Sequence, residues 1–529
     1  MVKRVGIWTI LIIILFLVSC SSEYQGTLPV MIIESDYDPF TMDRELWHDG
    51  IISISGTEDY DFANEKARLR GRGNSTWWLG EDKRPLRFRF EEERSLMGSD
   101  YEATDWILLA NLFDKSLIRN YSALTLAGNL DGLDFTPVPH HMHLYVNGEY
   151  MGVYLLVDER DVNEGRLELE FNIDPTISDY FFELDIRSAD DVEDIVVVNG
   201  WPYDVRFPSA SARTQGHMSY LQTFIQTVSD LIRVGDLDEI TNWIDMDSFV
   251  DFYIVQELFK NTDAYFTSIF MHIKGQGEDR RLFMGPVWDF DLCAGNVSGL
   301  RMGHGPEHLH VAIFNYWYRY LMDIDEFRER VRDRWNEVKY NEISETLWHV
   351  RNTVSRYRLE FERNFERHDV LTTYVFHLTP SELVEIDNFI GHANHFQRWM
   401  VDRINWLDDY FNGRTEGYDS LMAFVELHEE VIVFLDNERV ETENPVIILN
   451  DRVLFSKNDI LELFESLEGY IINNNEILIY GDDYTIKHII GTGEFEINNI
   501  EYGYGKPFSL RIGDQIFLPI WAIVEGLTS

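Results

Sequence analysis

The chain has 529 residues, and 92 acidic side chains against 45 basic ones give it a formal net charge of −47. So dense a negative field repels nucleic-acid backbones and anionic lipid headgroups, whose binding depends on clustered Lys and Arg. We therefore exclude a nucleic-acid-binding function. Hydrophobic residues make up 45% of the chain, enough to bury large cores, and the length predicts about three folding units.

The N-terminus has the pattern of a secretory signal. A short basic region precedes an apolar run, Ile7 to Val18, which is shorter than the ~20 residues that a membrane span requires. Leu17 to Cys20 resembles the lipobox of bacterial lipoproteins, in which the cysteine becomes the acylated first residue. We expect residues 1–20 to be a lipoprotein signal peptide, residues 21–29 a tether, and the membrane outside the cytoplasm the place of attachment. An uncleaved anchor helix is the alternative.

The sequence has one other cysteine, Cys293. With Cys20 acylated, no intramolecular disulfide can form, so packing alone must stabilise the exported chain. We expect Cys293 to be a small buried residue, because free cysteines are usually buried and inert. A catalytic thiol is the alternative.

The first strands are expected from Val30 onward. The loop from Gly71 to Trp77 has two glycines beside Asn, Ser and Thr, and its backbone amides can face an anion; a plain turn is the alternative. Lys83 to Phe90 alternates basic and apolar residues, which predicts a strand with one charged and one buried face. Lys83 is then either a phosphate contact or a solvated edge charge that discourages strand pairing.

A helix and a hairpin are expected next. Asp114 to Gly128 has an acidic N-cap, apolar residues at helical spacing and a glycine stop. Asn147-Gly148 separates two apolar runs and favours the two positive φ angles of a type I′ turn. Further strands are expected at Trp106 to Leu112 and at Phe181 to Ile186.

The rest of the chain is organised around the stretch from Glu257 to Asn296. An amphipathic helix end passes through the corner Asn261-Thr262-Asp263 into an apolar strand, Ser268 to Ile273. After a glycine-rich turn a second strand, Arg281 to Val287, ends in Trp288-Asp289-Phe290-Asp291. Such a hairpin brings both acidic corners to one end of a small sheet, where one carboxylate can orient a hydroxyl and the other can hold a divalent metal against phosphates. Ordinary turn carboxylates are the alternative.

Several segments, in this order, carry a family resemblance: RGRGNSTW, KRPLRFRF, WILLANLFDKSLIRN, YVNGEYMGVYLLVDE, FFELD, ELFKNTDAYFTSIFMHIK and FMGPVWDFDLCAGN. Together they resemble the spore coat protein H (CotH) kinase family over about Val30 to Tyr410. The resemblance implies an α+β chain with an atrophied protein-kinase-like two-lobe fold over residues 30–412. It also implies an enzyme that binds ATP with Mg²⁺ or Mn²⁺ and phosphorylates Ser or Thr of spore-coat or other envelope proteins.

The resemblance also assigns roles to acidic residues of the hairpin. Asp263 takes the place of the family's catalytic-loop Asp, and Asp289 takes the place of its metal-binding Asp. Asp291 is expected as a second metal contact.

Three further residues, Lys83, Arg72 and Asn74, fall in segments that the resemblance expects to face the phosphates of ATP.

One departure from protein kinases leaves a second function open. Kinases place a metal-binding Asn five positions after the catalytic Asp, where this chain has Ser268, and a hydroxyl is a weaker ligand for a hard cation. A catalytically weak pseudokinase scaffold that recruits coat or cell-wall proteins is therefore the alternative. A glycoside hydrolase using an acid pair such as Glu257 and Asp289 is a third, remote hypothesis.

The C-terminal part divides into helices and a strand-rich tail. From Tyr316 to about Phe411 aromatic residues recur at helical spacing, which predicts the core-facing helices of a second lobe. Residues 425–529 are acidic and strand-rich, and they resemble the copper amine oxidase N-terminal-like domain. The resemblance implies a stalk or attachment module. With only His428 and His488 and no cysteine in this tail, copper binding is not expected.

Overall fold

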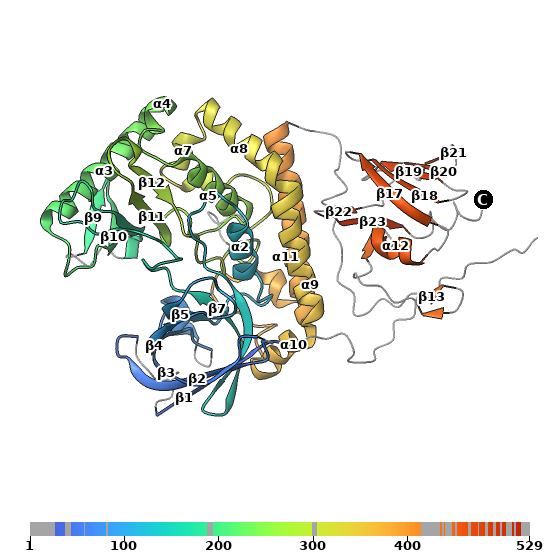
Figure 1. Cartoon of the computed structure of the whole chain (residues 1–529), viewed down its shortest axis with the longest axis horizontal. Helices are drawn as coiled ribbons and strands as arrows, with labels where there is room; N and C mark the ends of the chain where they lie inside the picture. Colours follow the sequence, from blue (N-terminus) through green and yellow to red (C-terminus); the bar gives the residue numbers. More distant parts are fainter. Residues whose placement is uncertain are drawn as a thin grey trace, which may run out of the picture. The chain divides into compact units, whose positions relative to one another are not determined.

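The computed structural model describes residues 27–413, apart from 37–43, 58, 81–82, 188–193 and 299–303, and a set of strands with one helix between residues 434 and 519. The chain is α+β and divides into two compact units, one within residues 26–417 and the other from residue 418 onward (Figure 1). The expected signal peptide, Cys20 and residues 21–26 of the expected tether lie outside the described residues.

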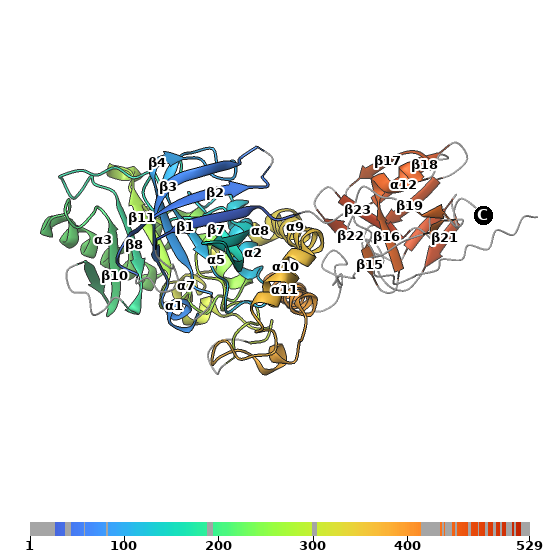
Figure 2. The same cartoon turned by 90° about the horizontal axis from the view of Figure 1, so that it is seen from below.

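Seven strands of the first unit form a closed barrel (Figure 2). They are β1 (Val30–Ser35), β2 (His48–Ser55), β3 (Phe62–Gly71), β4 (Leu86–Arg94), β5 (Ala103–Leu109), β6 (His140–Val146) and β7 (Glu149–Asp158). The order around the barrel is β1-β2-β3-β4-β5-β7-β6, and a parallel pairing of β1 with β6 closes it. Leu28 is buried and the Pro29 carbonyl accepts from His143 N, so the barrel begins within the segment expected to be a tether.

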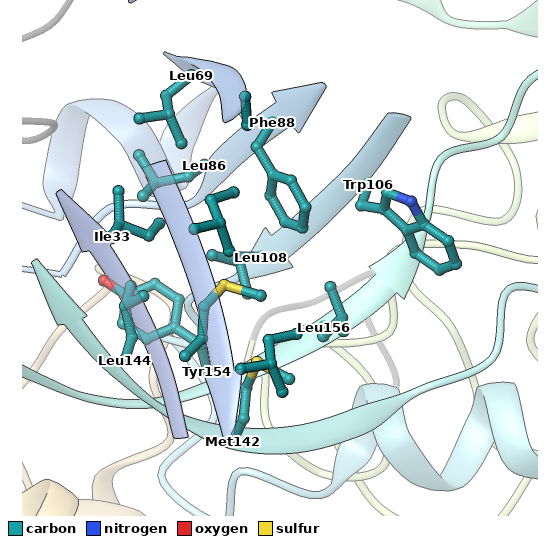
Figure 3. Packing of buried hydrophobic residues seen from close by; sticks show 14 of the residues in the cluster. Ile33, Leu69, Leu86, Phe88, Trp106, Leu108, Met142, Leu144, Tyr154 and Leu156 are labelled. Carbon is teal, nitrogen blue, oxygen red and sulfur yellow. The ribbon is translucent and has the colours of Figure 1, made fainter. Parts of the chain in front are cut away.

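Apolar and polar residues alternate along the strands, and the apolar side chains fill the interior of the barrel. Leu69, Phe88 and Leu108 are fully buried and lie among the side chains that fill the interior (Figure 3). On β4 the arginines between the buried residues point outward, which confirms one charged and one buried face. The strand begins at Leu86 rather than Lys83, because Pro85 cannot donate a hydrogen bond to a neighbouring strand. Lys83 is only 2% exposed, so a solvated edge charge is wrong.

Turn chemistry decides two further elements. Asn147 and Gly148 both have positive φ, 50° and 83°, and they join β6 to β7 as the sequence predicts. The helix expected from Asp114 begins later, as α2 (Arg119–Gly128). The Asp114 carboxylate instead accepts hydrogen bonds from the backbone N–H groups of Ser116 and Arg119, at 2.9 and 2.8 Å. Asp114 therefore stabilises a turn ahead of the helix and is not its N-cap.

The second sheet has five antiparallel strands in the order β12-β11-β8-β10-β9. They are β8 (Tyr180–Leu184), β9 (Ile195–Val198), β10 (Trp201–Phe207), β11 (Ile269–Lys274) and β12 (Arg281–Met284). Strands β11 and β12 form the predicted hairpin. β12 ends earlier than expected, since Gly285-Pro286 follows it and proline breaks a strand ladder.

The central helix of the first unit is α5 (Met246–Leu258). Its first turn is capped by Asp245, whose side chain accepts from Ser248 N. Every residue from Ser248 to Leu258 is buried, so the expected amphipathic pattern is wrong. The reason is that α5 contacts α2, α8 (Asp325–Val338), α11 (Phe389–Asn412) and β12, and a helix enclosed by neighbours is apolar on most sides (Figure 1).

Other helices complete the first unit. They are α1 (Ser75–Leu79), α3 (Gln215–Val234), α4 (Leu237–Ile240), α6 (Val311–Phe314), α7 (Tyr318–Leu321), α9 (Ser344–Arg356) and α10 (Arg358–Arg367). The expected aromatic stripes are buried, as Phe327, Trp335 and Phe396 show. Among the helices of the described residues, none has the length and apolar character needed to span a membrane.

The second unit is rich in strands, as expected. A pair is formed by β13 (Phe434–Leu435) and β14 (Glu438–Arg439), and α12 (Lys457–Leu463) follows β16. One sheet contains β15 (Ile447–Leu449), β16 (Arg452–Ser456), β23 (Gln515–Pro519) and β22 (Leu510–Ile512). The other contains β17 (Leu467–Asn473), β18 (Glu476–Gly481), β19 (Thr485–Ile489), β20 (Glu494–Ile497) and β21 (Ile500–Gly503).

Candidate active site

The first acidic corner is a tight turn between α5 and β11. The Asp263 carbonyl accepts from Phe266 N and Thr267 N, at 3.1 and 3.2 Å, and this turns the chain into the strand. Asn261 accepts from Asp263 N at 3.1 Å and donates to the Trp288 carbonyl at 3.4 Å. One amide side chain thus ties the first acidic corner to the second. The Asp263 side chain stays partly exposed.

The second acidic corner follows β12. Asp289 is partly exposed and has a φ of 65°, and Ser268 at the start of β11 has a φ of 55°. The Ser268 hydroxyl donates to an Asp289 carboxylate oxygen at 3.2 Å. Positive φ is uncommon outside glycine, and such strained residues concentrate at functional sites. The two corners therefore meet at one end of the hairpin, neither of them sealed from solvent.

The carboxylates at this end repel one another. Burial raises the pKa of Asp263 to about 7, and the negative charge of Asp289 adds to that rise. Asp291 is buried, and burial together with the charges of Asp289 and Asp263 raises its pKa well above the usual range. Arg187 lowers the pKa of Asp263, but it also pairs with Asp185 at 3.1 Å. The local field therefore favours binding of a cation or a proton.

Two arginines flank the acidic corners. The Arg160 guanidinium lies 3.9 Å from the centroid of the Trp288 ring, and that of Arg72 lies 5.5 Å from it. Burial, and then the positive charge of Arg160, lowers the pKa of Arg72 to about 10, while the charges of Glu159 and Asp289 oppose that shift. The charge of Asp289 thus acts on Arg72, whose role as a phosphate contact stays a prediction. A phosphate group between these guanidinium groups and a metal would offset the crowding of like charges.

Sequence reasoning missed Arg160 and Arg187. Each follows the end of a strand, Arg160 after β7 and Arg187 after β8, as Arg72 follows β3. The only sequence signal was the position of these cations just beyond strand ends. The convergence of those ends is a property of the tertiary fold.

The other two predicted phosphate contacts lie elsewhere. Lys83 is buried with its Nζ 5.4 Å from the Tyr154 ring centroid, and burial lowers its pKa to about 7 while the charge of Asp114 opposes that shift. The charge of Asp114 also contributes to the raised pKa of Asp291, so Lys83 is connected to the acidic cluster only through Asp114. Asn74 is exposed and accepts from Arg44 Nη1 at 3.3 Å. No contact within the described residues joins Asn74 to the carboxylates.

A buried ion pair stabilises the loop that forms the second acidic corner. Arg119 Nη1 donates to Asp114 at 2.5 Å, while its Nε and Nη2 donate to the carbonyls of Cys293 and Ala294, at 3.0 and 3.1 Å. The neighbouring Asn120 side chain accepts from Phe290 N at 2.8 Å. The first two residues of α2 thus fix the loop that carries Asp289 and Asp291.

A comparison with known protein families matches the part of the chain that contains this site. The CotH kinase protein family matches residues 69–407. The chain belongs to the CotH kinase family. Membership places it among spore-coat-related, kinase-like proteins, and the matched range contains both acidic corners together with Arg72 and Lys83. A search of curated proteins found no match to the chain.

A CotH kinase implies a divalent metal, so we tested whether the carboxylates fit one. Among the described residues, no group of three or more His, Cys, Asp or Glu side chains is arranged to hold a metal ion. Mg²⁺, however, is usually bound by one or two carboxylates together with substrate phosphates and water. Asp289 and Asp291 fit that mode, because burial and the neighbouring negative charges disfavour the ionised form of Asp291 unless a cation is present.

Two alternative catalytic residues are excluded by their surroundings. Glu257 is 1% exposed, pairs with Arg403 at 2.7 Å and accepts from His310 N at 2.7 Å. The glycoside hydrolase hypothesis is therefore wrong, since it needs two carboxyls facing an open cleft. The Cys293 thiol is buried and donates to the Phe290 carbonyl, and burial raises its pKa well above the usual range. Cys293 is thus a buried residue, as expected, and not an activated nucleophile.

Proposed function

We propose that this CotH kinase family protein transfers the γ-phosphate of ATP, with Mg²⁺ or Mn²⁺, to Ser or Thr of spore-coat or other envelope proteins. In this proposal the barrel and the helical part around α5 are the two lobes of an atrophied kinase-like fold. The observation that carries the proposal is the meeting of Asp263 and Asp289 at one end of the β11–β12 hairpin, beside Arg72.

The residues divide the work of phosphoryl transfer between them. Asp263, when unprotonated, accepts a hydrogen bond from the acceptor hydroxyl and orients its oxygen toward the phosphorus. Asp289 and Asp291 hold the metal, which when bound neutralises charge on the phosphate oxygens. Arg72 and Arg160 donate to the same phosphates, and the stacking of Arg160 on Trp288 fixes its direction. Catalysis then consists of positioning and charge stabilisation.

Ser268 supports a second candidate function, a pseudokinase scaffold. It occupies the position where protein kinases have a metal-binding Asn, and its hydroxyl donates to Asp289. Nucleotide affinity separates the two candidates. Titration with ATP in the presence of Mn²⁺ should give saturable binding for a kinase; no binding at millimolar ATP would leave only the scaffold.

We further propose an anchored location. The support is the sequence pattern of residues 1–20, in which Cys20 is the acylated residue. Residues 425–529 would then be a copper amine oxidase N-terminal-like stalk beyond the kinase-like domain of residues 30–412. Metabolic labelling with a fatty acid, compared between the natural chain and Cys20→Ser, tests the anchor; equal labelling of both would contradict it.

The decisive test of the kinase is Asp289→Asn. The change keeps the shape of the side chain but removes the charge that would hold the metal, so phosphate transfer from radiolabelled ATP should fall by roughly 10³-fold. The melting temperature should change little. Asp238→Asn is the matched control, because Asp238 is exposed on α4 and distant from the proposed chemistry. Undiminished transfer by Asp289→Asn would overturn the assignment.

A further inference from the structure

Four arginines form a cluster on the outer face of the barrel, here called the arginine square. Strands β3 and β4 are neighbours in the barrel (Figure 2), and in their pairing Arg68 lies opposite Arg89 and Arg70 lies opposite Arg87. All four guanidinium groups lie 4.8 to 5.8 Å from the centroid of the Trp47 ring. Like charges placed directly opposite each other destabilise a strand pair, so barrel stability does not explain the square.

The charges of the square are only partly balanced. Asp105 accepts from both Arg87 and Arg89, at 2.7 Å each, and Glu159 pairs with Arg87 at 3.1 Å. Within the described residues neither Arg68 nor Arg70 pairs with a carboxylate. Arg68 is exposed, whereas Arg70 is only partly exposed and its Nε is buried. The β3 side of the square therefore presents cations that have no carboxylate partner among the described residues, in a chain whose formal net charge is −47.

An exposed tryptophan adjoins the square. Arg70 Nη1 donates to the Arg44 carbonyl at 2.7 Å, and the Arg44 guanidinium lies 5.1 Å from the centroid of the Trp78 ring. Trp78 is 65% exposed, and its neighbour Leu79 is 49% exposed. Tryptophan and arginine are the residues most enriched at energetically important positions of protein interfaces. A partner can thus contact the basic arginine square and the apolar Trp78 side chain at neighbouring positions.

The square is also connected to the candidate active site. Arg44 Nη1 donates to the carbonyl of Gly73 at 2.7 Å and to Asn74. These two residues directly follow Arg72, on which the charge of Asp289 acts. A ligand bound to the square and Trp78 therefore lies on the segment that carries a proposed phosphate contact.

We propose that the arginine square and Trp78 dock an acidic, partly apolar segment of the protein substrate. Guanidinium groups bind carboxylates through paired hydrogen bonds, and the exposed Arg68 pairs with no carboxylate of the described residues. An extended peptide is narrow enough to contact the arginine square without contacting the rest of the surface. A flat anionic bilayer would also approach other parts of a chain whose formal net charge is −47, and charges act over about 8 Å at physiological salt. The identity of this partner as a substrate rests on the proposed kinase function.

Binding is tested on the full chain with a fluorescein-labelled peptide of alternating Glu and Ser residues that contains one Phe. Fluorescence anisotropy should show binding that weakens about tenfold when Gln replaces Glu in the peptide, and again in 0.5 M salt. The double variant Arg68→Gln/Arg70→Gln should bind about tenfold more weakly. Arg233→Gln/Arg356→Gln is the control, because both residues lie at the ends of helices away from the square, and it should bind as the natural chain does.

Partial burial of Arg70 makes a second variant necessary. Arg68 is exposed, and its contact in the described residues is with the Trp47 ring. The single change Arg68→Gln should therefore fold normally and still weaken peptide binding about threefold. Equal binding by natural chain and variants, equal binding of Glu and Gln peptides, or binding only to phosphatidylglycerol vesicles would overturn the proposal.

Kinetics separate a failure of docking from a failure of the kinase. For an acceptor peptide fused to the acidic segment, the double variant should raise KM about tenfold with kcat unchanged. For the same acceptor without the segment, KM should not respond to the variant. An unchanged KM for the fused peptide would reject docking while leaving the kinase intact. Absent transfer together with charge-dependent anisotropy would reject the kinase while leaving the docking surface for acidic peptides.

Discussion

Two carboxylates on the same short segment have opposite surroundings. Glu257, in the last turn of α5, is fully buried and is compensated by Arg403 and by the backbone N–H groups of His310 and Ala312. Asp263, six residues later, has no such partners among the described residues, and burial together with the charge of Asp289 raises its pKa to about 7. The comparison teaches that the partners of an acidic residue, rather than its type or burial, distinguish a structural carboxylate from a candidate catalytic one.

The same contrast recurs between Asp114 and Asp291. Asp114 is completely buried, yet it pairs with Arg119 and accepts from Ser116. Asp291 is also buried, but without a cationic partner among the described residues, and burial together with the charges of neighbouring carboxylates raises its pKa well above the usual range. One acid thus fixes the loop, and the other gains a counter-charge only when a cation binds. Breaking each kind of site should have effects of opposite sign on stability.

The largest effect is expected where a compensated acid loses its partner. Arg403→Ala leaves the Glu257 carboxylate buried without its cation, which should cost about 3–5 kcal/mol of unfolding free energy. Urea denaturation followed by circular dichroism measures this cost. Arg398→Ala is the control, because Arg398 is exposed on the same helix. A decrease in unfolding free energy below about 1 kcal/mol would show that Arg403 does not compensate the charge of Glu257.

An effect of opposite sign is expected at the acidic corner. A carboxyl whose pKa rises from 3.8 to about 7 on folding lowers stability as pH rises through that window, because the folded state binds the extra proton. Asp263→Asn removes this penalty and should stabilise the chain by roughly 1–2 kcal/mol at pH 8, after discounting for partial exposure. The difference in melting temperature between the variant and the natural chain should grow from about pH 4 to about pH 7 and stay constant above that. A variant that is less stable than the natural chain at pH 8 would contradict the proposed repulsion.

Activity should follow the same titration. If Asp263 must be unprotonated to orient the acceptor hydroxyl, kcat/KM should rise with pH through the neutral range and level off above it. A bound metal beside Asp289 would shift that rise to lower pH. Initial rates measured at saturating and at limiting Mn²⁺ check this expectation, and a flat profile from pH 5 to pH 8 would argue against the role of Asp263.

The smallest effect is expected at Ser268, which orients Asp289. Ser268→Ala removes one hydrogen bond, worth about 1 kcal/mol, so kcat/KM should fall about fivefold with little change in folding. Ser268→Asn restores a polar group at the position where protein kinases have a metal ligand, and it should retain or exceed the natural activity with Mg²⁺. Full activity of Ser268→Ala would show that the hydroxyl is dispensable.

Local chemistry made several parts of the fold predictable. The Asn147-Gly148 turn, the outward arginines of β4 and the β11–β12 hairpin follow from φ preferences and from alternation along a strand. The meeting of the two acidic corners followed from the hairpin alone. Each of these features depends on residues that are close in sequence.

Long-range packing made other parts unpredictable. The helix α5 is enclosed by α2, α6, α8, α11 and β12, so its sequence lacks a polar face. Asp114 has the composition of an N-cap but is bonded within a turn, because Arg119 ties it to the loop after Asp291. Arg160 and Arg187 come to the acidic corners from the ends of β7 and β8, and no spacing in the sequence brings those ends together.

The closure of the barrel has a consequence for how the chain is made. Strand β1 pairs with β6, where Val30 lies opposite His143, so its partner is synthesised about 110 residues later, or roughly 5–20 s at the usual rates of translation. Until then the nascent sheet has two unpaired edges, which are templates for aggregation. Fragments that stop before Val146 should therefore aggregate, and expression of the soluble unit should begin upstream of Leu28.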